Sequence, residues 1–382
     1  MSNCPIKAVQ RKQGGVFADA DAAATTTLQF VSGDFAQMTA FEPFDDFEEA
    51  IHFGDPVAEI QAARESAVMF DFSIRAHIEI TGTDRVKFLH NFCTADIQSL
   101  APRQGCEALV TNAKGRVLAH IFVFATTDSL WLETVRASEE PLLEHFQRYV
   151  ITEDVEFKSW TSELSELLVC GPKAIKRMAK LKLPLPEPDP YYHREDEWAD
   201  ATVSVRYVDW LGMPSFLIAG EQSTVAKLWT GLHKAGVQPG GAFAFHTLRV
   251  QSGFPLYGVD ITEDYLAQEV SRTPQAINFK KGCYLGQEPI ARIDALGHVN
   301  RELRGLRLEV GDLPSPGSSI ADQEGKEIGH ITSYALSPID SHARALGYVR
   351  SEFTAPGHTV LVRCTDEWVP AEVYWPRDAD VT

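Results

Sequence analysis

The stretch best suited to chemistry is residues 279–292, with the sequence FKKGCYLGQEPIAR. Its thiol, Cys283, lies between two glycines and follows Lys280 and Lys281. Glycine adopts backbone angles that are closed to other residues, so we expect a tight exposed turn here and not a regular element. Nearby positive charge favours the thiolate, which is the nucleophilic and metal-binding form. Cys283 is therefore a candidate reactive group, and a small buried packing residue is the alternative.

A second candidate is the carboxylate of Glu269, which follows a short polar stretch upstream of the two glycines. A carboxylate can accept two parallel hydrogen bonds from the edge of a pterin or a guanidine-like ring. Most glutamates are simply solvated, and the local sequence does not decide between these roles. Residues 280–307 contain six Lys or Arg and three Asp or Glu, a positive island that would suit an anionic ligand tail. Arginines on the outer face of a strand would explain the same pattern, and we favour that explanation for Arg304.

The sequence contains none of the motifs that mark several other common catalytic and metal sites. The twelve histidines include no H-x-H, H-E-x-x-H or mixed His/Cys cluster, so we expect no metal site. No G-x-S-x-G elbow, phosphate loop or dinucleotide fingerprint occurs. The six cysteines lie far apart without a C-x-x-C pair, which favours reduced thiols.

The elements that must position these residues mix strands with helices. An alternating strand at residues 77–81 leads into a helix that Thr83 or Asp84 can cap. Turns at 112–115 and 127–128 separate three apolar runs and predict an antiparallel meander. Hairpins beside helices indicate an α+β fold and not a doubly wound parallel sheet. We expect further helices over residues 139–150, 171–181 and 221–235, and further strands over 164–169, 202–208 and 215–218.

The chain is expected to divide into three parts. Residues 1–50 differ in composition from the rest and form a variable extension, which either packs a few Phe side chains on the body or carries a partner-binding motif. Residues 51–300 form two α+β lobes joined by a proline-rich connector at 183–190. Short strands with Gly and Pro between them predict a closed antiparallel barrel over residues 301–382.

Composition narrows the class of protein. A length of 382 residues and an apolar content of 44% predict two or three domains with real cores. The formal net charge of −18 repels a polyanion, so we expect no direct nucleic-acid partner. No apolar run approaches the ~18 residues of a membrane helix, and the N-terminal residues show no targeting pattern. We therefore expect a cytoplasmic protein with no membrane partner.

Residues 281–288, KGCYLGQE, followed by Ala291, Arg292 and Gly297, resemble the K-G-C-Y-x-G-Q-E signature of YgfZ-type proteins. These belong to the YgfZ/GcvT folate-binding superfamily, which also contains the glycine cleavage T-protein, an aminomethyltransferase. The likeness extends over most of the chain beyond the first fifty residues, including FDFS at 70–73, KGRV at 114–117 and GFPLYGVD at 253–260.

The resemblance implies two mixed α+β lobes and a C-terminal barrel around a central channel, with tetrahydrofolate bound near that channel. YgfZ-type proteins assist the synthesis or repair of iron–sulfur clusters in client enzymes, one of which modifies tRNA. The implied partners are therefore folate and iron–sulfur enzymes or cluster-assembly proteins. Cys283 and Lys281 would be the functional residues of the loop. The residues implied to bind folate are Glu269, Arg292, Asn112, Tyr257, Tyr284 and Gln287.

Two departures from the family pattern affect this hypothesis. In the aminomethyltransferases, the strand after the glycine turn carries an acid that acts on the folate nitrogen, whereas this chain has Ala119 and His120. This loss favours the iron–sulfur function over the alternative, a folate-dependent aminomethyltransferase or demethylase. A pure interaction protein with a decayed folate pocket is a third possibility. Secondly, Pro289 is expected to hold Glu288 in an extended conformation.

Overall fold

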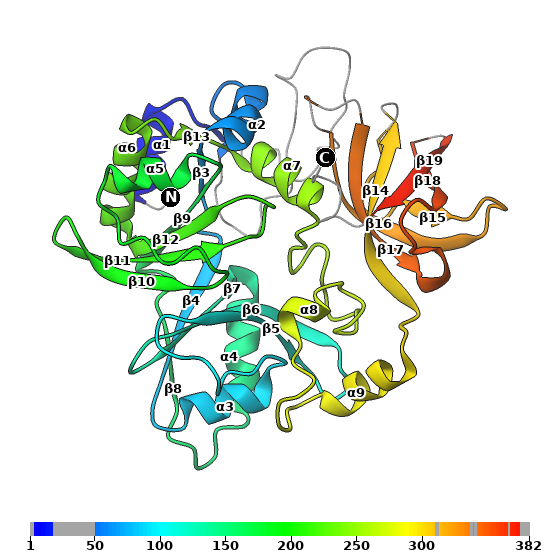
Figure 1. The fold of residues 1–382 in the computed structure, drawn as a ribbon, viewed down its shortest axis with the longest axis horizontal. Coiled ribbons are helices and arrows are strands. Elements are labelled where there is room, and N and C mark those ends of the chain that lie inside the picture. Colours follow the sequence, from blue (N-terminus) through cyan, green and yellow to red (C-terminus); the bar gives the residue numbers. More distant parts are fainter. Residues whose placement is uncertain are drawn as a thin grey trace.

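A computed structural model describes residues 4–17, 50–309, 313–336, 339, 342–365 and 367–374. Figure 1 shows two α+β lobes, one above the other, with a barrel beside them. In this part of the chain, no helix combines the length and apolarity needed to span a membrane. Of the predicted N-terminal extension, residues 1–3 and 18–49 lie outside the described residues, and these include most of its acidic and aromatic segment.

The lower lobe in Figure 1 is built on a five-stranded antiparallel sheet of order β5-β6-β7-β4-β8. Its first three strands form the predicted meander. Helices α3 and α4 cover one face, where Phe88 and Phe146 pack with Val123 and Leu132 from the strands. The elements are β4 (Arg75–Thr81), α3 (Arg85–Phe92), β5 (Gly105–Thr111), β6 (Val117–Ala125), β7 (Leu130–Val135), α4 (Glu139–Gln147) and β8 (Glu156–Ser159).

The upper lobe has a six-stranded sheet of order β10-β11-β12-β9-β3-β13, in which only the β13–β3 pair is parallel among the described strands. Helices α1, α5 and α6 pack on one face through Ile6, Met178 and Trp229. The elements are α1 (Pro5–Lys12), α2 (Pro56–Glu65), β3 (Val68–Asp71), β9 (Leu164–Cys170), α5 (Ala174–Ala179), β10 (His193–Trp198), β11 (Ala201–Val208), β12 (Ser215–Glu221), α6 (Gln222–Lys234) and β13 (Gln238–Pro239).

An aromatic core fills the space between the two lobes. Trp210 stacks on Phe254 with ring centroids 4.8 Å apart, and Phe122 lies 4.5 Å from Trp210. These rings are fully buried, so each contributes a large apolar area to the lobe interface. The two lobes therefore share one core in addition to the core that each has under its own helices.

The barrel closes in the order β14-β17-β16-β15-β18-β19, which confirms the predicted antiparallel barrel and the α+β class. Helix α7 (Ala242–Ser252) joins it to the lobes, because Arg249 donates to Asp260 and to Ser333 of β16 at 2.8 Å each. The strands are β14 (Arg301–Glu309), β15 (Ser319–Ala321), β16 (Glu327–Leu336), β17 (His342–Arg350), β18 (Thr359–Cys364) and β19 (Glu367–Tyr374).

Local details differ from the sequence predictions. Helix α1 and a two-stranded pair, β1 (Val16–Phe17) with β2 (Ala50–His52), are ordered elements within or bordering the predicted extension. Lys7 of α1 forms a buried ion pair with Asp71, with Nζ and Oδ2 2.7 Å apart. Asp84 precedes α3 but does not cap it, because its carboxylate accepts a hydrogen bond from the Asp154 amide instead.

Candidate functional site

The predicted reactive turn spans residues 281–286 and precedes α9 (Gln287–Leu296). The Asn278 side chain accepts hydrogen bonds from the backbone amides of Lys280 and Lys281 and so shapes the entry to the turn. Leu285 anchors the exit, because its amide donates to Asn91 and its carbonyl accepts from Thr111 Oγ1. A local side-chain contact therefore fixes the entry of the turn, and contacts with the lower lobe fix its exit.

Cys283 lies exposed on this turn, whereas the other five cysteines are buried or half-buried. Its neighbour Lys281 points inward and is only 8% exposed. The Lys281 ammonium donates to the carbonyls of Cys93 and Ala95 at 2.8 and 2.6 Å, just after α3 ends, and burial lowers its pKa. A cation at a helix C-terminus is stabilised by the carbonyls that have no partner within the helix. Lys281 is thus an anchor for the turn, and a chemical role beside Cys283 stays a prediction.

The two predicted tyrosines contribute to a common core beneath the site. Tyr284 is buried, and Tyr257 packs half-buried against the same cluster of apolar side chains. Burial raises the pKa of Tyr284 to about 12, and burial also raises the pKa of Tyr257. Asn112 shapes the β5–β6 turn instead, because its Oδ1 accepts from the amides of Lys114 and Arg116. Whether any of these residues contacts folate stays a prediction.

The exit of the turn corrects the sequence prediction. Gln287 begins a ten-residue helix, where an irregular stretch was expected, and Glu288 is helical and not extended. Pro289 lies in the first turn of α9, where proline is tolerated because these amides have no acceptor within the helix. Arg292 is exposed on α9, away from the single buried residue of that helix, Ile290.

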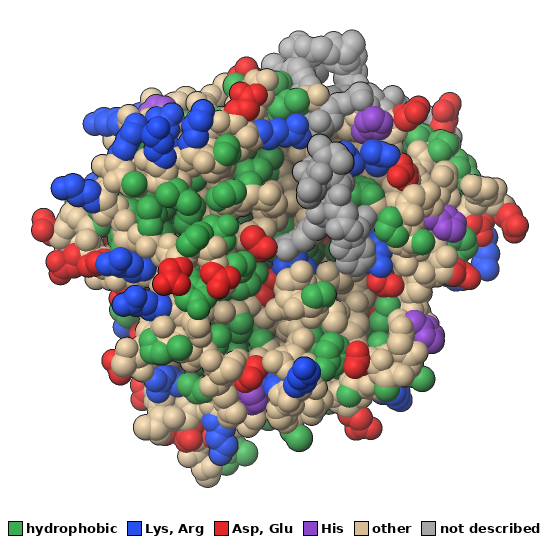
Figure 2. Space-filling view, in the orientation of Figure 1, with side chains coloured by type: hydrophobic (Ala, Val, Ile, Leu, Met, Phe, Trp, Pro, Cys, Tyr) green, Lys and Arg blue, Asp and Glu red, His purple; other side chains and the backbone are tan. Residues whose placement is uncertain are grey.

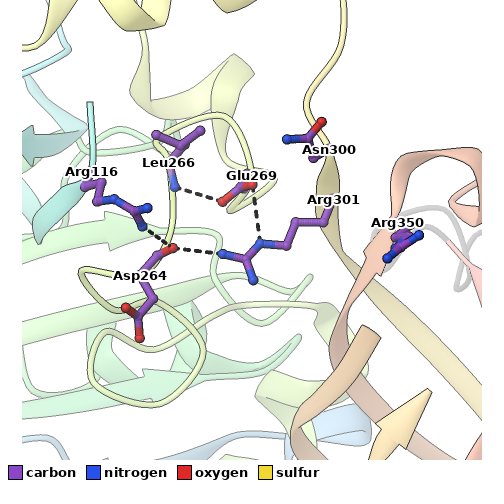
Figure 3. Close-up of a pocket in the computed structure, with 7 residues that line it drawn as sticks. All are labelled: Arg116, Asp264, Leu266, Glu269, Asn300, Arg301 and Arg350. Carbon is purple, nitrogen blue, oxygen red and sulfur yellow. Dashed lines mark hydrogen bonds and ion pairs between the residues drawn. The ribbon is translucent and has the colours of Figure 1, made fainter. Parts of the chain in front are cut away.

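A separate pocket of about 330 Å³ lies between the lobes and the barrel (Figure 3). Glu269 lies in its wall and is only 4% exposed. One carboxylate oxygen accepts from the Leu266 amide at 3.0 Å, and the other lies 3.3 Å from Nε of Arg301. The pocket is lined by Arg116, Asp264, Leu266, Glu269, Asn300, Arg301 and Arg350.

Three arginines give this pocket an excess of positive charge. Arg116 and Arg301 both donate to the Asp264 carbonyl, at 2.6 and 2.8 Å, from opposite sides (Figure 3). The Arg301 guanidinium also lies 4.7 Å from the Tyr265 ring, which favours a fixed orientation. Arg350 is exposed at the barrel end of the pocket. Sequence reasoning missed Asp264 and Arg350, because neither belongs to a motif and the fold alone brings them here.

One turn joins the pocket to the cysteine loop. In the β5–β6 turn, the Gly115 carbonyl accepts from the Ala267 amide, next to the pocket-lining Leu266. The same turn packs on Gly286, where an added Cβ would lie 2.5 Å from the Asn112 carbonyl oxygen. The candidate site therefore comprises two neighbouring features that share the β5–β6 turn.

Strand β6, which follows the β5–β6 turn, has Ala119 and His120 at the positions where an acid was expected for an aminomethyltransferase. Ala119 is fully buried, and Nε2 of His120 lies 2.8 Å from Oε1 of Glu107. Arg272 and Tyr191 also bind Glu107, with Nε of Arg272 2.7 Å from the carboxylate. Burial alone would raise the pKa of Glu107, but Arg272 and His120 bring it well below its usual range. Burial lowers the pKa of His120, and its contact with Glu107 makes this histidine a satisfied member of a buried network.

One buried group of side chains has the composition of a metal site. His77, Glu133 and Glu166 bring possible ligand atoms within 4.8 Å of one another. Arg206 forms ion pairs with both carboxylates and takes the place that a cation would need. We therefore assign no metal to this group.

Two α+β lobes that share a core, together with a closed six-stranded barrel, define a GcvT-like fold. The family model described as the GCVT N-terminal domain matches residues 13–281, and the model described as the glycine cleavage T-protein C-terminal barrel domain matches residues 301–377. The chain belongs to the glycine cleavage T-protein family.

Relatives with known names support this assignment. A chloroplastic Arabidopsis thaliana protein named as a candidate transferase is 27% identical over 339 residues, covering 88% of this chain and 75% of that protein. The aminomethyltransferase of Chloroherpeton thalassium is 27% identical over 320 residues, covering 81% of this chain and 87% of that enzyme. A crystal structure of glycine cleavage system aminomethyltransferase T from Bartonella henselae superposes with a TM-score of 0.83 at 20% identity, covering 98% of this chain and 96% of that one.

Proposed function

We propose that this protein binds tetrahydrofolate and transfers a one-carbon group to or from it. The observation that carries the proposal is the pocket whose walls combine the buried carboxylate of Glu269 with three arginines. Membership in the T-protein family, and relatives named aminomethyltransferase, support the same reaction class.

The chemistry of the pocket matches the two ends of a folate. A pterin ring presents neighbouring N–H donors, and a carboxylate such as that of Glu269 can accept hydrogen bonds from both of them. The glutamate tail carries carboxylates, which pair with guanidinium groups such as those of Arg116 and Arg350. Leu266 and Arg301 already hold Glu269 in place, so little ordering of this side chain would be needed on binding.

Proton handling must differ from that of the aminomethyltransferases. Ala119 has no ionisable group, and His120 is bound to Glu107 within the core. A general acid or base has to lie within hydrogen-bond reach of the reacting nitrogen. We therefore propose a transferase whose proton transfer uses another group or solvent, and we expect slow turnover compared with relatives that retain the acid.

Calorimetric titration with tetrahydrofolate tests the binding site. We expect Glu269→Gln to weaken binding by about tenfold or more, because a charged hydrogen-bond acceptor is lost while shape is retained. Glu324→Gln, in the exposed β15–β16 turn, is the control for the charge change and should bind like the wild type. Absence of binding to the wild-type protein would refute the proposal, as would equal affinity in Glu269→Gln when its thermal stability is unchanged.

A second candidate function is assistance in iron–sulfur cluster assembly or repair, as in YgfZ-type proteins. The observation that favours it is the exposure of Cys283 on an anchored turn. Any effect on tRNA modification would then be indirect, through a client enzyme. Complementation of a strain that lacks the gene, under oxidative stress, tests this function: full rescue by Cys283→Ala would exclude it. Steady turnover of aminomethyl or methyl donors by the same variant would favour the transferase.

We propose a cytoplasmic location independently of the function. The comparison that bears on this proposal is the relative whose name contains the word chloroplastic. Fractionation of cells expressing the native gene, with an antibody against the chain, tests it directly.

A further inference from the structure

A group of lysines covers three helices of the upper lobe. Figure 2 shows Lys and Arg side chains gathered over this part of the molecule, where Figure 1 places α1, α5 and α6. All of the lysines concerned are exposed. We call this surface the basic helical face, and define it by Lys12, Lys173, Lys176, Lys180, Lys182, Lys227 and Lys234.

The three helices form one continuous surface. All of them pack on the same side of the six-stranded sheet, through a shared apolar cluster. Nζ of Lys180 and a guanidinium nitrogen of Arg177 both donate to the Ala235 carbonyl, which joins α5 to the end of α6. The Trp229 indole donates to the Gln13 side chain at 2.7 Å, which joins α6 to the end of α1. The lysines therefore belong to one joined surface.

The positive charge of this surface is not neutralised locally. Segments 5–12, 171–182 and 222–234 contain no Asp or Glu. Among the described residues, none of the seven lysines forms an ion pair with a carboxylate. In a chain with a formal net charge of −18, such a concentration of positive charge is a strong local exception. Unpaired surface lysines raise the local concentration of anionic partners.

We propose that the basic helical face docks an acidic polypeptide surface of a partner protein. Ile175 is 43% exposed on α5 between Lys173 and Lys176, so the face offers apolar contact as well as charge. The aromatic residue of these helices, Trp229, is buried, so it cannot stack on nucleic-acid bases. The acidic remainder of the chain would also repel an extended polyanion, such as RNA or an anionic bilayer, beyond the edge of the face. A compact acidic partner avoids that repulsion.

Binding to defined probes tests the proposal. The probes are an eight-residue oligoglutamate peptide, which is short enough to lie within the face, a 20-nucleotide single-stranded RNA, and vesicles containing phosphatidylserine, each titrated at low and at physiological salt. We expect the peptide to bind most tightly and to weaken as salt rises. The triple variant Lys173→Gln/Lys176→Gln/Lys227→Gln should bind it about tenfold more weakly, as expected when three surface ion pairs are lost.

The control removes the same charge elsewhere. Lys87→Gln/Lys114→Gln/Lys326→Gln changes three exposed lysines outside the face and should leave peptide affinity within about twofold of the wild type. Circular dichroism and thermal melting confirm that both triple variants are folded. Equal losses in the two variants would overturn the proposal, because net charge alone would then explain binding. Tighter binding of RNA or vesicles, or no binding of the peptide, would overturn it as well.

Discussion

Two glycines at the ends of α9 provide a controlled test of how the cysteine turn is held. Gly286 and Gly297 both have left-handed backbones, with φ of 85° and 79°. Their surroundings differ: a Cβ added to Gly286 would lie 2.4 Å from Thr111 Oγ1 and 2.5 Å from the Asn112 carbonyl oxygen, whereas a Cβ on Gly297 would meet nothing within 4 Å. Alanine at either position therefore has the same backbone strain, and only one position adds a clash.

The expected magnitudes follow from this difference. For Gly297→Ala, left-handed strain of ~1–2 kcal/mol is partly offset by reduced freedom of the unfolded chain, leaving a loss of about 1 kcal/mol in the free energy of unfolding. For Gly286→Ala, contact with a backbone oxygen that cannot rotate away adds about 1–3 kcal/mol more. We expect Gly286→Ala to be the more destabilising substitution by about 2 kcal/mol.

Urea unfolding at 25 °C, followed by tryptophan fluorescence, measures both values. The rate at which Cys283 reacts with a thiol reagent should change in Gly286→Ala, because the turn must shift to relieve the clash, and should be preserved in Gly297→Ala. Equal stability losses in the two variants would refute the view that the β5–β6 turn holds the cysteine turn in place.

Three further predictions concern stability and reactivity. Burial raises the pKa of Glu59 to about 7 from an ordinary value of 4.5, so its contribution to stability is present below pH 4.5 and is lost as pH rises through 7. The free energy of unfolding should fall by up to about 3 kcal/mol over this range, and Glu59→Gln should flatten the dependence in urea titrations at each pH. Asp260→Asn leaves the buried Arg249 without its ionic partner and should cost ~3–5 kcal/mol, measured by thermal unfolding and by protease sensitivity of the barrel. Under native conditions one thiol should react rapidly with a thiol reagent, and Cys283→Ser should abolish that fast phase.

The overall architecture could be predicted from sequence because its signals are local. Alternating apolar residues separated by Gly and Pro indicate the barrel strands, and the turn at 112–115 indicates the meander. Strand β10 was missed because its sequence, HREDEW, is almost entirely charged, and only pairing with β11 identifies it as a strand. Helix α9 was missed because Gly282 and Gly286 indicate a turn and Pro289 indicates an extended Glu288, although the first helical turn accepts proline.

The site was harder to predict because its contacts connect residues far apart in the chain. Nothing near Lys281 in the sequence indicates that its ammonium reaches carbonyls about 190 residues earlier. Similarly, Glu107 and Arg272 pair across 165 positions. The motif around Cys283 indicated an exposed turn, and the structure places the thiol in the open as expected. Its chemical role stays a prediction.

The β5–β6 turn has a thermodynamic consequence. Arg116 lines the pocket from one side of this turn, and Asn112 packs on Gly286 from the other. If a ligand moves Arg116 and the turn moves with it, the support of the cysteine turn changes. Linkage between two sites is reciprocal, so any factor by which the ligand alters the equilibrium constant for modifying Cys283 must reappear as the same factor in ligand affinity once the thiol is modified. The oxidation state of one sulfur atom would then change how tightly the pocket holds a ligand.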